Sequence, residues 1–267
     1  MRVYINEIET YIYKETLFSL RDKVNSNADI CIINGFLEKE DVSLKENDRV
    51  TFIKRGEMPS KDELESLMVS RHTPLVHNKL KEGKVAIAGV GGLGSNVAIS
   101  LARVGVGFIK IIDFDVVEPS NLNRQQYYIR HIGMKKVEAL KEILMDINPF
   151  IEVQAIDIRI DKENIEDLFK DVDIVVEAFD DASYKALIVS EVLYKFKDKR
   201  IVSASGMAGF YSNNIIKSKK INKRLYICGD FVHEAKMGDG LMAPRVAIVA
   251  NHEANTVVRL LLDEEEV

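Results

Sequence analysis

A glycine-rich segment carries the clearest chemical signal in the sequence. Residues 89–94 read GVGGLG, a G-x-G-x-x-G pattern that directly follows the apolar run 85–88 and precedes the helical pattern of 93–104. Such glycines permit a tight turn in which backbone N–H groups approach a phosphate, and the helix N-terminus adds positive potential. The segment therefore predicts a nucleotide or dinucleotide site, although a turn needed only for close helix packing would have the same glycines. The glycines expected to contact the nucleotide are Gly89, Gly91, Gly92 and Gly94.

Charged side chains follow at spacings that suit a nucleotide. Asp113 ends a predicted strand, where a carboxylate can accept hydrogen bonds from the ribose hydroxyls of NAD or of ATP. Lys135 and Lys136 stand in the first turn of the helix predicted at 134–147, although that position favours anions. A polyphosphate bound near Arg124 and Lys136 would explain this placement. The alternative is a pair of solvated lysines on an ordinary amphipathic helix, which the spacing alone fits equally.

The elements that must position these residues alternate between strands and helices. Apolar strands are predicted at 85–88, 108–112, 152–156, 174–178 and 201–204, with helical patterns between them. This order predicts an α/β fold with a doubly wound, mostly parallel sheet, in which ligands bind at the carboxyl ends of the strands.

The first 56 residues predict a separate small domain. Two short strands within 2–14 are followed by a helix at 16–24, with Leu17, Leu20 and Val24 on one side, and the further strands are at 30–33 and 49–53. The order suggests a ubiquitin-like β-grasp unit, and the alternative is an extension of the larger sheet. Pro59 then breaks the chain ahead of a capping-box pattern. We therefore expect domains at 1–56 and 71–267, joined by a linker helix at 57–70.

Composition excludes several classes of function. A net charge of -5 and a pI of about 5.7 argue against a broad surface for nucleic acid or anionic membrane. No apolar run approaches the roughly 20 residues that span a bilayer, and Glu7 interrupts any secretory signal. The two cysteines, Cys31 and Cys228, cannot build a four-cysteine zinc site and fit a reducing compartment. We expect a cytoplasmic protein with no zinc and no nucleic-acid or membrane partner.

Taken together, the motifs resemble a known family, the ThiF/MoeB and ubiquitin-activating superfamily of adenylyltransferases. Besides GVGGLG, the matching segments are ARVGVG at 102–107, DFD at 113–115, SNLNRQ at 120–125, GMKKV at 133–137 and NP at 148–149. The similarity spans about residues 70–215. It implies a Rossmann-like domain that binds ATP and Mg²⁺.

The resemblance also implies roles for individual residues. Asp113 corresponds to the ribose-binding aspartate, Asp180 to the catalytic aspartate that holds magnesium, and Arg71 to an arginine that reaches the partner's active site in a dimer. The implied catalytic residues are Arg124, Lys136, Asp180 and Arg71. The implied nucleotide-binding residues are Gly89, Gly91, Gly92, Gly94, Asp113, Asp115, Ser120, Asn121, Arg124, Lys136 and Asp181.

The implied reaction is attack by the C-terminal carboxylate of a carrier protein on the α-phosphate of ATP, with loss of pyrophosphate. Because both reactants are anionic, catalysis depends on neutralising charge and aligning the attack. Residues 1–56 resemble the sulfur carrier ThiS, but such carriers end in a free Gly-Gly, whereas here Gly56 is followed by Glu57. We therefore interpret this region as a degenerate carrier domain and expect a separate ThiS-like protein as the substrate.

Two further groups of residues leave alternatives open. Some relatives use a cysteine to carry the activated substrate, and Cys228 is the only candidate in the larger domain, although a lone cysteine is more often a packing residue. A second group near the C-terminus suggests a metal site or, more simply, polar surface residues. That group is His233, Glu234, His252 and Glu253.

From the resemblance we expect an adenylyltransferase of the ThiF type, acting as a homodimer on a ThiS-like sulfur carrier in thiamine thiazole synthesis. One alternative keeps the chemistry and changes the carrier to one for molybdopterin, cysteine or tRNA thiolation. Another is an NAD-binding oxidoreductase, against which Arg124 and Lys136 count. The last is a non-catalytic scaffold that binds through its β-grasp domain.

Overall fold

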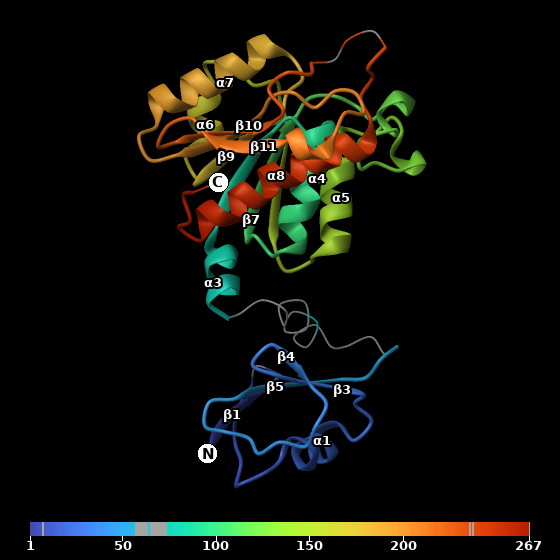
Figure 1. Ribbon diagram of the computed structural model, residues 1–267, viewed down its shortest axis with the longest axis vertical. Coiled ribbons are helices and arrows are strands. Elements are labelled where there is room, and N and C mark those ends of the chain that lie inside the picture. The colour runs from blue at the N-terminus through green and yellow to red at the C-terminus, as the bar shows by residue number, and fades with distance from the viewer. Residues whose placement is uncertain (7, 57–63, 65–73, 235, 237, 267) are drawn as a thin grey trace. The chain divides into compact units, whose positions relative to one another are not determined.

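The computed structural model describes residues 1–6, 8–56, 64, 74–234, 236 and 238–266. The chain forms two units, Met1–Asn78 and Lys79–Val267 (Figure 1). Most of the linker helix predicted at 57–70 lies outside the described residues, so that prediction stays untested.

Over its described residues up to 56, the N-terminal unit contains a five-stranded mixed sheet and one helix. Its elements are β1 (Arg2–Ile5), β2 (Ile8–Tyr11), α1 (Leu17–Asn25), β3 (Ile30–Ile33), β4 (Phe36–Glu38) and β5 (Arg49–Ile53). The strand order is β2-β1-β5-β3-β4, in which β1 and β5 are parallel and the other neighbours are antiparallel. This small mixed sheet with its helix confirms the predicted ubiquitin-like unit, and the short strand β4 was not expected from the sequence.

Helix α1 supplies the core of this unit. Thr16 caps it, since its hydroxyl accepts a hydrogen bond from the backbone N–H of Ser19 at 3.3 Å. Leu17 and Leu20 are buried in a cluster with strand residues such as Phe52. Val24 is on the same side of this helix by its spacing, but it stands in the last turn and is 46% exposed, so it does not join the core.

The second unit is built on a seven-stranded sheet in the order β11-β12-β10-β9-β6-β7-β8. Its strands are β6 (Lys84–Ala88), β7 (Phe108–Asp113), β8 (Glu152–Asp157), β9 (Ile174–Glu177), β10 (Arg200–Ala204), β11 (Lys217–Lys220) and β12 (Leu225–Gly229). All neighbours are parallel except β11, which runs antiparallel to β12. The doubly wound, mostly parallel sheet is confirmed, whereas β11 and β12 were not predicted.

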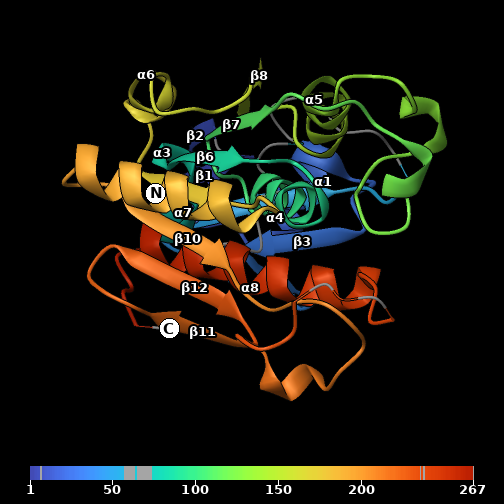
Figure 2. The ribbon, with the colours of Figure 1, turned by 90° about the horizontal axis from the view of Figure 1, so that it is seen from above.

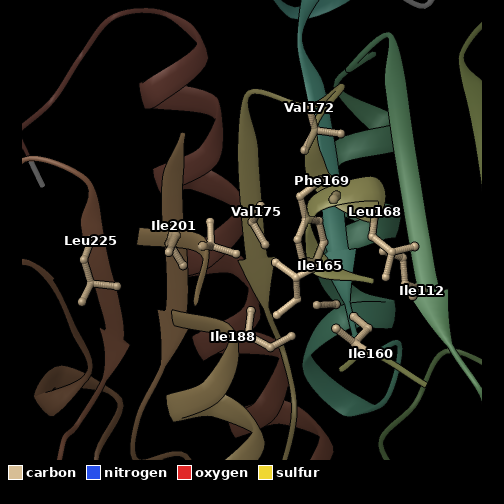
Figure 3. Close-up of a cluster of buried hydrophobic side chains, with 13 residues drawn as sticks. Ile112, Ile160, Ile165, Leu168, Phe169, Val172, Val175, Ile188, Ile201 and Leu225 are labelled. Carbon is tan, nitrogen blue, oxygen red and sulfur yellow. The ribbon is translucent and has the colours of Figure 1, made fainter. Parts of the chain in front are cut away.

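Helices cover both faces of this sheet. They are α4 (Gly92–Arg103), α5 (Lys136–Ile147), α6 (Ile165–Phe169), α7 (Ala182–Lys195) and α8 (Ala243–Leu261). Helix α3 (Pro74–Glu82) precedes β6 in the chain. Helix α4 packs against α5 and α8 on one face, and α6 packs against α7 on the other (Figure 2). Figure 3 shows the second contact, where Phe169 and Ile188 meet strand residues such as Val175 and Ile201. Burial on both faces explains the continuous apolar strands in the sequence.

The glycine turn between β6 and α4 leaves no room for a side chain at its last glycine, Gly94. Gly94 lies in the first turn of α4, and a Cβ there would stand 1.9 Å from the carbonyl oxygen of Gly89. Gly89 itself has a φ of +87°, a conformation that favours glycine. Close packing is therefore the role of Gly94.

We predict that Gly94→Ala lowers the free energy of unfolding by about 3 kcal/mol, because a backbone carbonyl must move to admit the methyl group. Gly92→Ala is the matched control, since Gly92 also lies in the first turn of α4 but the nearest atom to its added Cβ is a side-chain carbon of Val246 at 3.2 Å, which can move more easily than backbone. Urea unfolding followed by circular dichroism measures both variants. Equal stability losses in the two would contradict the steric explanation.

Candidate functional site

A cavity of about 210 Å³ opens where the strands of the large sheet reach their carboxyl ends. Its wall takes residues from the segments that follow β6, β7, β8 and β9, which is where doubly wound sheets bind ligands. Nine of the residues expected from the sequence line it. They are Gly89, Gly91, Gly92, Asp113, Asp115, Arg124, Lys136, Asp180 and Asp181.

The glycine turn is fixed in place by hydrogen bonds to its backbone. Asp113 is buried, and its Oδ2 accepts the N–H of Val90 at 2.8 Å, while its Oδ1 accepts the N–H of Asp115 at 2.9 Å. The hydroxyl of Tyr127 donates to the carbonyl of Val90 at 2.7 Å, and burial raises the pKa of that phenol. Hydrogen bonds from both the N–H and the carbonyl of Val90 thus hold the turn that faces the cavity.

Lys136 lines the cavity, and an ion pair with Asp115 holds its side chain there. Helix α5 begins at Lys136 rather than at the predicted residue 134, with Lys135 as its N-cap. The Lys136 side chain is 8% exposed, and its Nζ lies 2.8 Å from Oδ2 of Asp115. Lys135 is partly exposed and pairs with Asp157 at 3.2 Å. The interpretation of both lysines as solvated is therefore wrong for Lys136, which is buried.

Arg124 lines the cavity without a carboxylate partner among the described residues. Its guanidinium donates to the carbonyl of Ser120 at 3.2 Å and to the side chain of Asn123 at 2.8 Å. Ser120 and Asn121 do not line the cavity. They form the 3₁₀ turn ahead of Arg124, in which Asn121 Oδ1 accepts the N–H of Glu118 at 3.0 Å. Direct phosphate contacts by Ser120 and Asn121 stay a prediction.

Two aspartates after β9 have different surroundings. Asp181 caps helix α7, since its Oδ1 accepts the N–H groups of Ser183 at 2.8 Å and Tyr184 at 3.1 Å. Asp180 is exposed on the cavity wall and has no hydrogen-bond or ion-pair partner within the described part of the chain. Asp180 is therefore the carboxylate available to hold a cation, because carboxylate oxygens are the ligands that Mg²⁺ prefers.

Other lining residues were missed in the sequence. Arg159 and Ile160 follow β8, while Phe179 and Tyr184 follow β9, with their ring centroids 6.0 Å apart. Gln125 contributes a buried Oε1 that accepts no hydrogen bond from any described residue, which suits a ligand that donates. The signal that would have found Arg159 is its position just beyond a predicted strand end.

The other residues singled out in the sequence lie elsewhere or are not described. Gly94 does not line the cavity, and Arg71 lies outside the described residues. Cys228 is buried in β12, where burial raises the pKa of its thiol to about 12. Its Sγ lies near the hydroxyls of Ser218 and Thr256, at 3.4 and 3.7 Å. A thiol that stays protonated is a poor nucleophile, so this geometry favours the packing interpretation.

The histidines and glutamates near the C-terminus do not gather around one point as metal ligands would. His233 pairs with Asp230 at 2.8 Å, whereas His252 Nδ1 lies 3.1 Å from the hydroxyl of Ser218. Glu253 is fully buried, and burial raises its pKa well above the usual value. No group of three or more potential ligands of these types is positioned for a metal in the described ranges, which disfavours a metal site here. Among the same residues, no helix is long and apolar enough to cross a membrane.

Comparison with curated proteins finds relatives that match part of the chain. UBA4 of Candida glabrata, an adenylyltransferase and sulfurtransferase, is 40% identical over 130 residues, which cover 48% of this chain and 30% of that protein. The tRNA threonylcarbamoyladenosine dehydratase of Bacillus subtilis is 39% identical over 131 residues, covering 48% of this chain and 51% of that protein. The matches thus span between about a third and a half of these relatives' own lengths.

Solved structures share the fold. The E. coli tRNA N6-threonylcarbamoyladenosine dehydratase TcdA in complex with ATP superposes with a TM-score of 0.68 at 20% identity, covering 78% of this chain and 98% of that one. E. coli MccB with ATP gives a TM-score of 0.57 at 22% identity, covering 79% and 74%. At these identities the likeness concerns the fold alone.

Two family models match nearly the whole sequence. The ThiS-like ubiquitin model covers residues 1–56, and the ThiF family model covers residues 65–267, which is well over half of the chain. The clamped glycine turn, the cations and the free carboxylate described above lie within the second range. The chain therefore belongs to the ThiF family and carries a ThiS-like ubiquitin domain at its N-terminus.

Proposed function

We propose that this protein uses ATP to adenylate the C-terminal glycine carboxylate of a ubiquitin-like sulfur carrier, releasing pyrophosphate. One observation supports this most directly. A single cavity combines a clamped glycine turn, the guanidinium of Arg124 without a carboxylate partner among the described residues, the buried cation of Lys136 and the free carboxylate of Asp180. Relatives that are named adenylyltransferases carry the same family domain.

We propose that the N–H groups and charged side chains of the cavity determine how the nucleotide is oriented. Its phosphates would meet the backbone N–H groups at the start of α4, and its ribose would meet Asp113. Arg124 and Lys136 would then face the α-phosphate and the leaving pyrophosphate. Because the attacking carboxylate and the phosphates are all negative, preorganised cations lower the barrier by stabilising charge at the transition state.

Asp180 is the residue proposed to hold Mg²⁺. Such ions are commonly bound by one or two carboxylates together with substrate phosphates, and Asp180 offers an uncommitted carboxylate on the cavity wall. Bound there, Mg²⁺ would neutralise phosphate charge. Asp181, by contrast, already caps α7, so its part is to orient that helix beside the site.

The carrier is proposed to be a separate ThiS-like protein ending in Gly-Gly, as used in thiamine thiazole synthesis. The chain's own ThiS-like domain cannot supply the carboxylate, because Gly56 is joined to Glu57 by a peptide bond. The domain scheme proposed is 1–56, a linker at 57–70 and 71–267. We further propose that the protein forms a homodimer in which Arg71 reaches the active site of the partner subunit. We also propose a cytoplasmic location.

A second candidate keeps the activation chemistry and changes the acceptor. The Bacillus subtilis relative is named a tRNA threonylcarbamoyladenosine dehydratase, which favours a carboxylate carried on tRNA. The net charge of -5 counts against a broad tRNA surface on this chain. ATP–pyrophosphate exchange measured with purified carriers, each with and without its terminal glycine, separates the candidates. Exchange stimulated only by one glycine-ended carrier would identify the acceptor, whereas exchange stimulated only by modified tRNA would favour the dehydratase activity.

We predict that Arg124→Ala and Asp180→Asn each reduce carrier-dependent ATP–pyrophosphate exchange by about 100-fold or more, because each removes a group that stabilises charge at the reacting phosphates. Arg130→Ala and Asp198→Asn are matched controls, since both residues are exposed and neither lines the cavity. Thermal unfolding verifies that the variants fold. Exchange at the wild-type rate in either cavity variant would refute its assigned role.

We also predict that Cys228→Ser leaves pyrophosphate exchange unchanged, because adenylation needs no protein nucleophile and the thiol is buried away from the cavity. The same assay with the carrier at saturation measures the effect. A loss of exchange in a variant that retains the wild-type unfolding temperature would show that Cys228 contributes to the activation step.

A further inference from the structure

An arginine outside the phosphate-binding set lies on the cavity wall against two aromatic rings. The guanidinium carbon of Arg159 is 5.7 Å from the ring centroid of Phe114 and 5.1 Å from that of Tyr184. All three side chains line the cavity. Cation–π contacts of this kind favour a guanidinium that stays beside the rings rather than extending into solvent. The two rings thus position Arg159, and no described carboxylate pairs with it.

The charges around Arg159 leave it available to a ligand. In the described part of the chain no hydrogen bond or ion pair joins its side chain to another residue. The acidic residue two positions earlier, Asp157, pairs instead with Lys135 at 3.2 Å. An exposed arginine held by ring contacts alone, beside a cavity, presents a planar cationic surface to what enters.

The strand order places Arg159 at one end of the bound nucleotide. Strands β6, β7 and β8 are consecutive neighbours in the sheet (Figure 2). The glycine turn follows β6, Asp113 ends β7, and Arg159 follows β8. If the phosphates lie on the turn and the ribose at Asp113, the base must lie one strand farther along the sheet edge, beside Arg159.

We infer that Arg159, with Phe114 and Tyr184, forms the base-recognition wall of the site, on which the guanidinium stacks against the purine ring of the nucleoside triphosphate. Guanidinium planes and aromatic rings both stack on nucleobases. This inference rests on the proposed function and names the part of the nucleotide that Arg159 contacts. Arg159 is a binding residue with no role in the transfer step.

Equilibrium binding of ATP and of inorganic tripolyphosphate to the full chain tests this inference. Arg159→Met, which keeps the aliphatic stem, weakens ATP binding by about tenfold and leaves tripolyphosphate binding unchanged. Arg159→Lys keeps the charge but lacks the plane, and it shows the same loss. Arg130→Met is the matched control, because Arg130 also lies over a tyrosine ring, 4.7 Å from the centroid of Tyr128, but does not line the cavity. The control binds both ligands as the wild type does.

Three results would overturn the inference. Equal losses of ATP and tripolyphosphate affinity in Arg159→Met would make the residue a phosphate ligand. Unchanged ATP affinity in that variant, or wild-type affinity in Arg159→Lys, would exclude stacking by the guanidinium plane. In each case ATP binding by the wild type leaves the proposed function standing, whereas a wild-type chain that binds no ATP would overturn both.

Discussion

The carboxylate of Asp113 is the constraint on which the site depends. It stands at the end of β7, yet its Oδ2 accepts the N–H of Val90 in the turn after β6, at 2.8 Å. Its other oxygen accepts the N–H of Asp115, whose side chain pairs with Lys136. One buried carboxylate therefore joins the glycine turn, the end of β7 and, through Asp115, a cation from α5. Because hydrogen bonds to a charged acceptor are among the strong ones, this junction gives the cavity a fixed shape before any ligand enters.

The charges around that junction explain why the cavity suits a polyanion. Lys136 is buried and matched by Asp115, so its charge is compensated in the free protein. Arg124 and Arg159 are held by neutral groups, by a carbonyl and an amide in one case and by aromatic rings in the other. Because Arg124 has no carboxylate partner among the described residues, its charge is available to a phosphate. A nucleoside triphosphate with its metal would complete this distribution of charge.

Local sequence patterns were sufficient for the turn and for most of the strands, because the periodicity and the glycines are themselves the physical cause of those elements. Asp113 was found from its position at a predicted strand end, and Lys136 from its place in the first turn of a predicted helix. Arg159 was not: it lies just beyond a predicted strand end, but the order of strands in the sheet is needed to show that this end shares a cavity with the glycine turn. Strand β11 was missed because Lys217–Lys220 has no apolar alternation and pairs through its backbone at the sheet edge. The exposure of Val24 depends on how α1 packs, which periodicity alone does not determine.

The central claim is that the cavity holds a nucleoside triphosphate by its phosphates at the glycine turn. Crystals of the protein soaked separately with ATP and Mg²⁺ and with NADH test it most directly. We expect density for ATP with its phosphates against residues 89–92 and Arg124, and an empty cavity after the NADH soak. A dinucleotide bound across this sheet edge, with ATP absent, would contradict the account.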